Sequence, residues 1–565
     1  MKRESVMKLP HVFVAAAITL MAYGYPLSAQ PEATNAEQVE ALKTLVQSVY
    51  QPDLPGATVV VSKGGEVIYA GAQGMADLEM QVRVQPDHIF RLASVTKQYT
   101  SAAILTLIDE GKLELEDPVS RWWPDSGYGD VTVHQLLNHT SGIASYTSIP
   151  GYMMDERIRR DLTTDELIAT FSELPVDFAP GAEWRYNNSG YVLLGAIIEE
   201  LTDMPWHQYI ADKLLQPQGI SKTDFYPDQQ VVPGRVHGYH LSAEGPINAP
   251  WLSMSQPHAA GALSATAAEV DKWQYALHTG NVLPDELYQR MIAPSEVSGP
   301  YAYGLQNGSV RGWPVLEHGG GIHGFSTYAL WMPEQEISVV VLTNYVGYSP
   351  APGVVAHRLA AIAAGKPYPV EQPRIELSTE QLQPIEGTYR INEQTTRTLK
   401  VKDGQLVSQR QGGSESLAYP VTPDRFVMEH SVVYFDIVRD EAGQVTGVNF
   451  YQQGSSEPEF AEKISDEITQ RETVDLTAEQ KARLLGDYQL QPGFIITIRD
   501  TDDGLTAQAT GQGAFPVLAE SAAILFNDQY GIKMVFEVPA EGPATALTLH
   551  QGGQQLPAPR VTSVE

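Results

Sequence analysis

Cysteine is absent from the 565-residue sequence, and positive charge is scarce. The lack of cysteine excludes disulfide bonds, a cysteine nucleophile, cysteine-ligated zinc and a lipid-modified N-terminal cysteine. The 37 lysines and arginines are outnumbered by 68 aspartates and glutamates, which gives a formal net charge of −31 at pH 7. Because nucleic acids and anionic membrane surfaces repel so acidic a chain, the sequence predicts neither as a partner.

Long apolar runs are also few, and the run near the N-terminus is too short to cross a bilayer. Lys2 and Arg3 precede the apolar stretch Val12–Tyr23, and Leu27–Ala29 is typical of a cleavage site. A membrane-spanning helix needs ~20 apolar residues. The sequence therefore predicts a signal peptide over residues 1–29 and a periplasmic or secreted protein with no stable membrane anchor. An uncleaved anchor is the alternative.

Sequence motifs of several other enzyme classes are missing. There is no Gly-x-Ser-x-Gly, which argues against an α/β-hydrolase. There is also no His-Glu-x-x-His, phosphate-binding loop or dinucleotide-binding fingerprint. His134 with His139, and His237 with His240, are spaced like metal ligands but have no evident carboxylate partner, so we expect structural roles for them. The sequence thus predicts no metal and no organic cofactor.

The chain divides into a long N-terminal part and two shorter parts. Apolar strands are predicted within Ala57–Ala70 and Phe325–Asn344, with a mostly helical region between them. Strands contributed by both ends of a segment indicate an α+β domain in which one antiparallel sheet carries an inserted helical subdomain. We place this domain at residues 30–365, before a proline-rich linker at 365–373.

The remaining sequence contains short predicted strands, glycine turns and an internal repeat. The pattern of Leu377–Tyr389 is repeated in Leu476–Tyr488. Repeated units with alternating apolar residues indicate two small antiparallel β-barrels or sandwiches, which we place at residues 366–470 and 471–565. Neither unit contains an evident catalytic cluster, so we expect a structural or interaction role for both.

Ser94 and Lys97 lie three residues apart where a helix is predicted to begin. Apolar residues from Val95 to Ile108 fit one helical face, and Gly111 can end the helix. Since residues i and i+3 share a face, the amine can reach the hydroxyl. A lysine whose pKa is lowered by burial can take the serine proton, which activates the nucleophile. For this pair alone, a serine N-cap followed by an exposed lysine is the alternative.

A second stretch, Glu183–Tyr191, places Tyr186 and Asn188 two residues apart and just before an apolar helix predicted at Tyr191–Leu201. A phenol beside a cation can transfer a proton, and an asparagine amide can hydrogen-bond a substrate amide. We also expect Asn188 to cap the helix. The alternative for this stretch is an aromatic core residue beside a helix cap.

A third stretch has His318 followed by Gly319, Gly320 and Gly321, shortly before a strand predicted from Phe325. Consecutive glycines cost backbone entropy, so we expect them where a substrate must lie against bare backbone. Such an edge offers N–H groups to an oxyanion and to a peptide-like substrate. A flexible turn is the alternative.

Three motifs occur along the chain in the order found in the serine penicillin-recognising enzymes: Ser94-x-x-Lys97, Tyr186-x-Asn188 and His318-x-Gly320. The sequence therefore resembles this superfamily over about residues 35–365, and Leu136–Gly142 is similar to another of its recurrent stretches. The superfamily includes class C β-lactamases, D-Ala-D-Ala carboxypeptidases, related esterases and D-aminopeptidases. The two C-terminal β units are similar in arrangement to those of bacterial D-aminopeptidases.

One position departs from the β-lactamase pattern. Many β-lactamases have a lysine, which is always cationic, at the position of His318. Histidine has an ordinary pKa near ~6.5, so it would hold a substrate carboxylate more weakly and in a pH-dependent manner. The difference favours the D-aminopeptidase and esterase branches, which often show His-x-Gly.

The resemblance implies a serine hydrolase that acts through an acyl-enzyme. In this interpretation Ser94 attacks a carbonyl, Lys97 and Tyr186 transfer its proton, and the Ser94 N–H binds the oxyanion. The other residues expected to bind the substrate or the oxyanion are Asn188, His318, Gly320 and Gly321. The expected substrate is a small molecule or a peptide, with amide bonds of small peptides favoured. A carboxylesterase, a class C-like β-lactamase and a non-enzymatic penicillin-binding sensor are the alternatives.

Overall fold

The computed structural model describes residues 35–561 except 125, 150, 394, 412, 453, 469–472, 492–493, 502–503, 511–512 and 552–553. The predicted signal peptide and the predicted boundary at residue 470 therefore lie outside the described residues. None of the helices in the described part has the length and apolar composition needed to cross a membrane.

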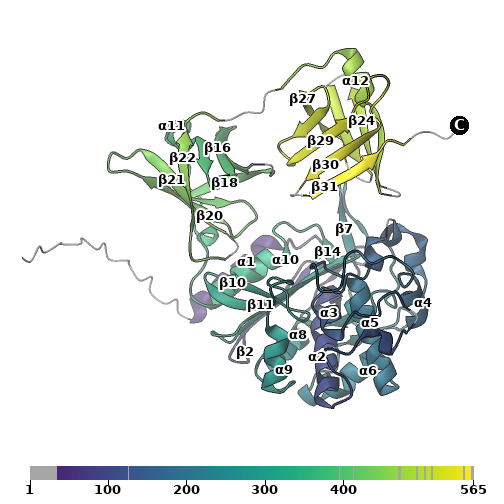
Figure 1. The fold of residues 1–565 in the computed structure, drawn as a ribbon. Helices are drawn as coiled ribbons and strands as arrows, with labels where there is room; N and C mark the ends of the chain where they lie inside the picture. Colours follow the sequence, from purple (N-terminus) through teal and green to yellow (C-terminus); the bar gives the residue numbers. More distant parts are fainter. Residues whose placement is uncertain are drawn as a thin grey trace, which may run out of the picture.

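A six-stranded antiparallel sheet forms the centre of the N-terminal domain (Figure 1). Its strands, in spatial order, are β10 (Gln306–Val310), β11 (Trp313–Ile322), β12 (Phe325–Met332), β13 (Ile337–Thr343), β1 (Ala57–Lys63) and β2 (Glu66–Gln73). Strand β1, from the start of the domain, pairs with β13, from its end, between Ala57–Thr343 and Lys63–Ile337. The prediction of one antiparallel sheet built from both ends of the domain is confirmed.

Both faces of this sheet are covered, which explains the unbroken apolar sequences of β1 and β13. Helices α1 (Asn35–Val49) and α10 (Pro352–Ala363) pack on one face, where Val59 belongs to their core. Helix α8 (Ala267–His278) packs on the other face, where Val60 belongs to the core of the helical subdomain. The sheet thus separates two hydrophobic cores.

The helical subdomain is inserted between β2 and β10. Its helices are α2 (Thr96–Asp109), α3 (Val133–Leu137), α4 (Thr164–Ala169), α5 (Asn188–Thr202), α6 (Trp206–Ile210), α7 (His258–Gly261) and α9 (Asp285–Ile292). Short strands form three minor sheets: β3 (Met75–Asp77) with β4 (Val82–Arg83); β5 (Phe90–Arg91), β9 (Leu263–Ala265) and β6 (Asp224–Phe225); and β14 (Tyr345–Val346), β7 (Tyr239–Ser242) and β8 (Gly245–Asn248). Helix α2 lies at the centre of this subdomain, with most of its residues buried.

The next part of the chain forms a closed antiparallel barrel, preceded by the short helix α11 (Thr379–Leu382). Its strands are β15 (Gly387–Arg390), β16 (Thr396–Lys402), β17 (Gln405–Arg410), β18 (Glu415–Thr422), β19 (Arg425–Met428), β20 (Tyr434–Arg439), β21 (Val445–Tyr451) and β22 (Glu459–Ser465). Strand β15 pairs with β22, which closes the barrel.

The last part contains two antiparallel sheets around one core, preceded by helix α12 (Ala478–Leu484). The strands of the first sheet are β23 (Gly486–Gln491), β24 (Phe494–Thr501), β25 (Gly504–Ala509) and β26 (Phe515–Pro516). Those of the second are β27 (Leu518–Ser521), β28 (Ile524–Asn527), β29 (Ile532–Glu537), β30 (Ala546–Gln551) and β31 (Gln554–Pro559). The prediction of two small antiparallel β units after an α+β domain is confirmed.

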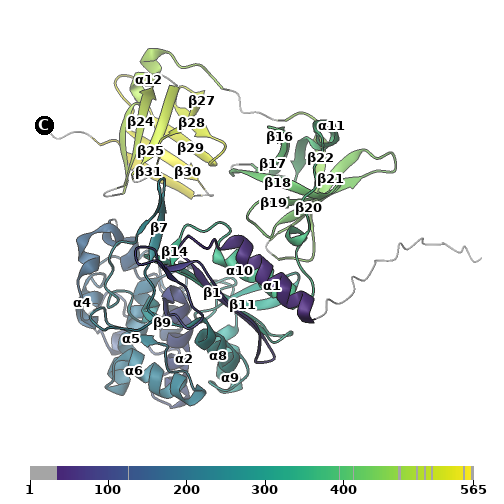
Figure 2. The ribbon, with the colours of Figure 1, turned by 180° about the vertical axis from the view of Figure 1, so that it is seen from behind.

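Both β units lie on the side of the N-terminal domain where α1 and α10 are found (Figures 1 and 2). The barrel residues Val427 and Tyr434 share a hydrophobic core with α1 and α10, and Arg311 donates a hydrogen bond to the Tyr434 hydroxyl at 2.7 Å. The last part meets the barrel through the Asp528 carbonyl, which accepts from the Glu415 N–H at 3.3 Å. The barrel is therefore packed on the N-terminal domain through apolar side chains.

Candidate active site

Ser94 lies in a short 3-10 turn, η1 (Ala93–Val95), and α2 begins only at Thr96. The expected helix start at Ser94 is thus two residues too early. Ala93 has a φ of +50°, a left-handed conformation that costs an alanine of order 1 kcal/mol. The Thr327 hydroxyl on β12 holds this turn by donating to the Leu92 carbonyl at 2.8 Å. The turn that presents Ser94 is therefore fixed by the central sheet.

Lys97 follows in the first turn of α2 and is fully buried. Its Nζ lies 3.3 Å from Ser94 Oγ, 2.9 Å from Asn188 Oδ1 and 2.8 Å from the Ala260 carbonyl oxygen. Burial lowers the pKa of Lys97 well below its ordinary value. A neutral amine can donate its two N–H groups to the two carbonyl oxygens and keep its lone pair for the serine proton.

The Tyr186 ring also packs against the amine, with Lys97 Nζ 4.8 Å from the centre of the ring. Burial raises the pKa of Tyr186, an effect that the nearby Ser94 hydroxyl partly offsets. No hydrogen bond of regular geometry engages the phenol within the described part of the chain. The pKa of Lys97 is thus lowered and that of Tyr186 is raised, which suits Lys97 as a base and Tyr186 as an acid.

The helix cap expected of Asn188 is formed instead by its neighbour, Asn187. The Asn187 side chain accepts from the Gly190 N–H at 2.8 Å, and α5 begins at Asn188. Asn188 accepts from Lys97 and donates through Nδ2 to Thr147 Oγ1 at 2.9 Å. The prediction that Asn188 caps the helix was wrong, because its side chain is engaged by the buried amine.

The glycines of β11 differ in the space around them. A Cβ at Gly320 would lie 2.2 Å from both the Leu92 carbonyl oxygen and Thr327 Oγ1, whereas a Cβ at Gly321 would meet no atom within 4 Å. Gly320 therefore allows β11 to approach the Ser94 turn, and Gly321 faces open space. The pairing of β10 with β11 ends at Gln306–Glu317. The backbone beyond Glu317 is thus not paired with β10.

These groups meet at a small cavity of about 70 Å³, which we call the Ser94 cavity. Its lining residues are Ala93, Ser94, Tyr146, Thr147, Met153, Asn188, Leu252, Pro257, Ala260, Gly261, Gly321 and Ile322. All of them belong to the N-terminal domain. The structure thus brings together the predicted Ser94, Asn188 and Gly321 from three distant segments.

His318 lies behind Tyr186 and does not line the Ser94 cavity; the two ring centres are 6.2 Å apart. Its Nδ1 donates to the Gly319 carbonyl at 2.6 Å, so its Nε2 accepts from the Tyr301 hydroxyl at 2.8 Å. Burial, with a smaller contribution from the nearby Lys97, lowers the pKa of His318 to about 4. The expected ordinary pKa near 6.5 was therefore wrong, and the imidazole is neutral at pH 7.

His139 is a neighbour of Tyr186 to which the sequence assigned no role in the site. Its ring centre lies 4.5 Å from that of Tyr186 and 4.6 Å from that of Tyr301, and its Nδ1 accepts from the Asn187 N–H at 3.2 Å. Burial, with smaller contributions from Lys97 and His318, lowers the pKa of His139 well below its ordinary value. The sequence pointed to this position through the recurrent stretch Leu136–Gly142 and through its spacing from His134, but not to a contact with Tyr186.

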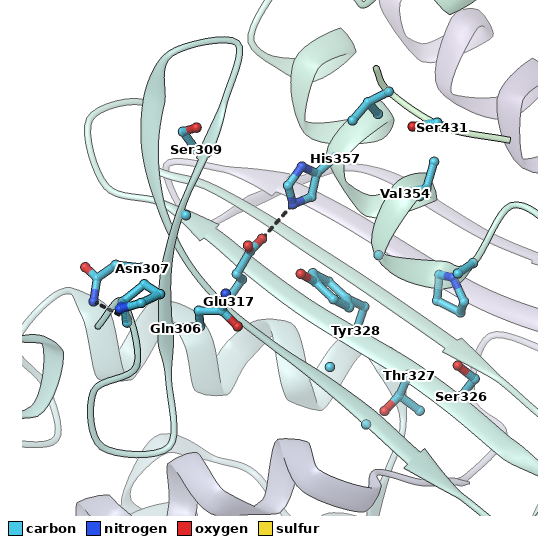
Figure 3. Close-up of a pocket in the computed structure, with 18 of the residues that line it drawn as sticks. Gln306, Asn307, Ser309, Glu317, Ser326, Thr327, Tyr328, Val354, His357 and Ser431 are labelled. Carbon is cyan, nitrogen blue, oxygen red and sulfur yellow. Dashed lines mark hydrogen bonds and ion pairs between the residues drawn. The ribbon is translucent and has the colours of Figure 1, made fainter. Parts of the chain in front are cut away.

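A larger cavity, of about 910 Å³, also borders β11. It is lined by Glu317 and Gly319 of this strand, by His357 of α10 and by barrel residues 431–433. Figure 3 shows the Glu317 carboxylate pointing toward His357, whose Nε2 donates a hydrogen bond to it at 2.7 Å. Since Ser94 does not line this cavity, the predicted chemistry belongs to the smaller one.

The histidine pairs considered as metal ligands have other partners. His134 contacts the Tyr303 hydroxyl, and His240 Nε2 accepts from the Gly324 N–H at 2.9 Å. In the described part of the chain, no three histidines, aspartates or glutamates are grouped as metal ligands.

Comparisons with known proteins place these observations in a family. The family model described as Beta-lactamase matches residues 37–364. The chain is 27% identical over 351 residues to the D-aminopeptidase of Gluconobacter oxydans (strain 621H), an alignment that covers 59% of this chain but only 63% of that protein, less than two thirds. It is 23% identical over 443 residues to Penicillin-binding protein 4* of Bacillus subtilis (strain 168), covering 74% of this chain and 97% of that protein.

A solved structure extends the likeness beyond the N-terminal domain. The octameric penicillin-binding protein homologue from Pyrococcus abyssi has a TM-score of 0.54 and 24% identity to this chain. The match covers 75% of this chain and 99% of that one. At this identity the likeness concerns the fold.

Proposed function

Because the chain belongs to the Beta-lactamase family and is a serine hydrolase, we propose that it hydrolyses amide bonds of small peptides through an acyl-enzyme, with a D-residue on the acyl side. One observation carries this proposal. The buried Lys97 amine donates its two N–H groups to Asn188 Oδ1 and to the Ala260 carbonyl oxygen, which leaves its lone pair for the Ser94 hydroxyl at 3.3 Å. An amine held in this way is a general base for the serine.

In the proposed reaction, Ser94 Oγ attacks the substrate carbonyl while Lys97 takes the hydroxyl proton. The N–H groups of Ser94 and Gly321 bind the oxyanion that forms. Tyr186, which stays protonated because its pKa is raised, then gives its proton to the leaving amine and is reprotonated from Lys97. Water activated by the same groups releases the acyl group.

The neutral His318 influences the choice of substrate. A substrate carboxylate at this position would find no fixed positive charge, because the pKa of His318 is lowered to about 4. This favours an aminopeptidase or amidase over a β-lactamase or a D-Ala carboxypeptidase, both of which must bind a carboxylate beside the scissile bond. The similarity to a D-aminopeptidase supports the same choice.

The proposal extends to export and to the roles of the domains. We propose that residues 1–29 direct the chain to the periplasm or the medium and that residues 30–365 form the catalytic domain. Residues 366–470 and 471–565 are proposed as structural or interaction domains, since every residue lining the Ser94 cavity lies between Ala93 and Ile322.

A substrate panel tests the proposed activity. We expect D-aminoacyl p-nitroanilides to be hydrolysed with higher kcat/KM than their L-counterparts, and a chromogenic cephalosporin to be hydrolysed poorly. The matched comparison is a D-alanyl p-nitroanilide against the p-nitrophenyl ester of the same residue, each corrected for the larger intrinsic reactivity of the ester. Hydrolysis of esters alone would contradict an amidase.

A carboxylesterase is the second candidate, because the Ser94 cavity of about 70 Å³ suits a short acyl chain. It predicts activity on p-nitrophenyl acetate and butyrate without activity on any anilide. A non-enzymatic sensor instead predicts that fluorescent penicillin or a fluorophosphonate labels Ser94 stoichiometrically and that no substrate is turned over. An intact-mass time course separates these outcomes.

A further inference from the structure

A second cavity adjoins the Ser94 cavity beyond the end of β11. Its volume is about 220 Å³, and Leu252 lines both cavities. Ile322, the last residue of β11, lines the Ser94 cavity, while the next residue, His323, lines the second one. We call this second space the Arg235 cavity, after one of its lining residues.

The Arg235 cavity contains two guanidinium groups, of which one is paired. Arg91 donates to Asp228 at 3.2 Å, and the second carboxylate oxygen of Asp228 accepts from the Met254 N–H at 3.0 Å. Arg235 is partly exposed and forms no ion pair with any carboxylate of the described residues. Burial and the charge of Arg235 lower the pKa of Arg91, while Asp228 raises it. The cavity thus holds positive charge that the protein has left unpaired.

The other charged groups of the cavity leave Arg235 available. Asp77 also lines it, but its carboxylate lies 3.9 Å from His237 Nδ1 and forms no ion pair with Arg235 among the described residues. Trp251 and Phe325 supply apolar walls. In a chain with a formal net charge of −31, an unpaired arginine in a cavity that shares Leu252 with the Ser94 cavity is a local exception to the overall charge.

The geometry of the active site decides which part of a substrate reaches this cavity. Tyr186, the proposed proton donor to the leaving group, lies beside His318, at the end of the glycine run opposite to Ile322. The leaving group therefore occupies the His318 end, and the acyl part extends toward Ile322 and His323. Two residues of extended chain span ~7 Å, so the acyl part needs only that length to pass from Gly321 to His323.

We propose that the Arg235 cavity binds a carboxylate on the acyl part of the substrate, so that the preferred substrates are small peptides or acylated D-amino acids that carry an acidic group before the scissile bond. This inference rests on the proposed function and names the substrate class of the same site. Arg235 is then a specificity-determining residue, because a guanidinium matches a carboxylate in charge and in the spacing of its donors.

Four substrates test the inference: N-succinyl-D-alanine and the uncharged N-butanoyl-D-alanine, each as its p-nitroanilide and its p-nitrophenyl ester. We expect kcat/KM to be about tenfold higher for the succinyl member of each pair, the usual value of one charge-assisted hydrogen bond. The ratio should fall to about one in Arg235→Gln and with rising salt, and it should rise in Asp77→Asn, which removes a repelling charge.

The matched control is Arg410→Gln, which removes an exposed arginine from barrel strand β17 and should keep the succinyl preference. Equal kcat/KM for the two acyl groups, or a ratio that survives Arg235→Gln, would overturn the inference. If only the esters are cleaved and the succinyl ester is preferred, the amidase proposal fails while the carboxylate site stands. Binding can also be measured without turnover, by calorimetric titration of Ser94→Ala with N-succinyl-D-alaninamide and with N-butanoyl-D-alaninamide. Equal Kd values for these two amides would also overturn the inference.

Discussion

Lys97 is surrounded by groups that can hydrogen-bond an amine but carry no negative charge. Its partners are the Asn188 amide, the Ala260 carbonyl and the Ser94 hydroxyl, and burial lowers its pKa well below the ordinary value. A carboxylate in this position would instead have stabilised the protonated lysine. The choice of neutral partners therefore determines whether the amine can act as a base.

The first prediction concerns this base. Lys97→Arg should lower kcat by about 10²–10⁴-fold, because a guanidinium stays protonated and cannot accept the serine proton. In the unmodified enzyme, kcat/KM should fall as the pH falls through the lowered pKa of Lys97, since the protonated amine is inactive. The measurement is a pH–rate profile with the best anilide or ester. Activity that persists in Lys97→Arg would assign the base elsewhere.

The second prediction concerns the nucleophile. Ser94→Ala should abolish turnover and the covalent mass increase seen with a fluorophosphonate, while the melting temperature stays within a few degrees. The matched control is Ser48→Ala on α1, whose hydroxyl donates to the Leu45 carbonyl within the same helix; this variant should behave as the unmodified protein does. Turnover retained by Ser94→Ala would refute the assignment of the nucleophile.

The sequence was informative about residues with a distinctive side chain and spacing, and silent about main-chain groups. Ser94, Lys97 and Tyr186 were predicted and lie together, but the Ala260 carbonyl is a backbone acceptor far along the chain that no side-chain pattern reports. The sequence also could not show which of Asn187 and Asn188 caps the helix. Both residues are asparagine and can cap a helix equally well, and the buried Lys97 amine, which engages Asn188, decides between them.

Strand β11 shows how one element sets the geometry of the site. Its glycines were predicted to expose bare backbone, but the structure shows that they differ. Gly320 allows the Ser94 turn to pack closely against β11, whereas Gly321 lines the Ser94 cavity. The sequence alone could not distinguish them, because the difference lies in Leu92 and Thr327, which approach from other segments.

A matched pair of substitutions tests this difference. Gly320→Ala should lower both activity and thermal stability, since its Cβ would lie 2.2 Å from the Leu92 carbonyl oxygen and must push β11 away from the Ser94 turn. An overpacked site of this kind typically loses 1–3 kcal/mol. Gly321→Ala should leave the melting temperature nearly unchanged, because its Cβ meets no atom within 4 Å. Equal losses of stability in thermal melts of the two variants would contradict this assignment.

The repeat found in the C-terminal sequence corresponds to a repeated element. In each unit a short capped helix, α11 or α12, leads into the first strand, and a buried tyrosine bonds back to a carbonyl at the end of the helical segment. Tyr389 donates to Ile385 at 2.5 Å, and Tyr488 donates to Leu484 at 2.8 Å. The sequence revealed the repeat but not that one unit closes into a barrel, because closure depends on the distant pairing of β15 with β22.

At the scale of the molecule, the family resemblance stated from three motifs is confirmed, and so is the order of an α+β domain followed by two β units. The N-terminal domain also concentrates the buried histidines. Burial lowers the pKa of His258 and of His278 to about 3, and that of His318 to about 4. Each is neutral when folded and takes up a proton near pH 6.5 when unfolded.

The fourth prediction follows from these histidines. Because the unfolded state binds more protons, the free energy of unfolding should fall as the pH drops from about 6.5 toward 4, with His318 alone contributing about 3 kcal/mol. All 8 tryptophans lie in the N-terminal domain, so their fluorescence in urea titrations reports its unfolding. His318→Gln should flatten the pH dependence, and the β30 control His550→Gln should not. A urea midpoint independent of pH over this window would contradict the prediction.

The shared core between the barrel and the N-terminal domain has a practical consequence for anyone who wishes to make a smaller biocatalyst from this gene. Truncation after α10 would remove Val427 and Tyr434, which pack against side chains of α1 and α10, and would expose an apolar surface to solvent. The last β unit keeps its own core, between Leu484 and Ala558, so its removal exposes far less. The shortest variant that stays folded and soluble should therefore end just after β22, so that the barrel still covers the apolar surface it shares with α1 and α10.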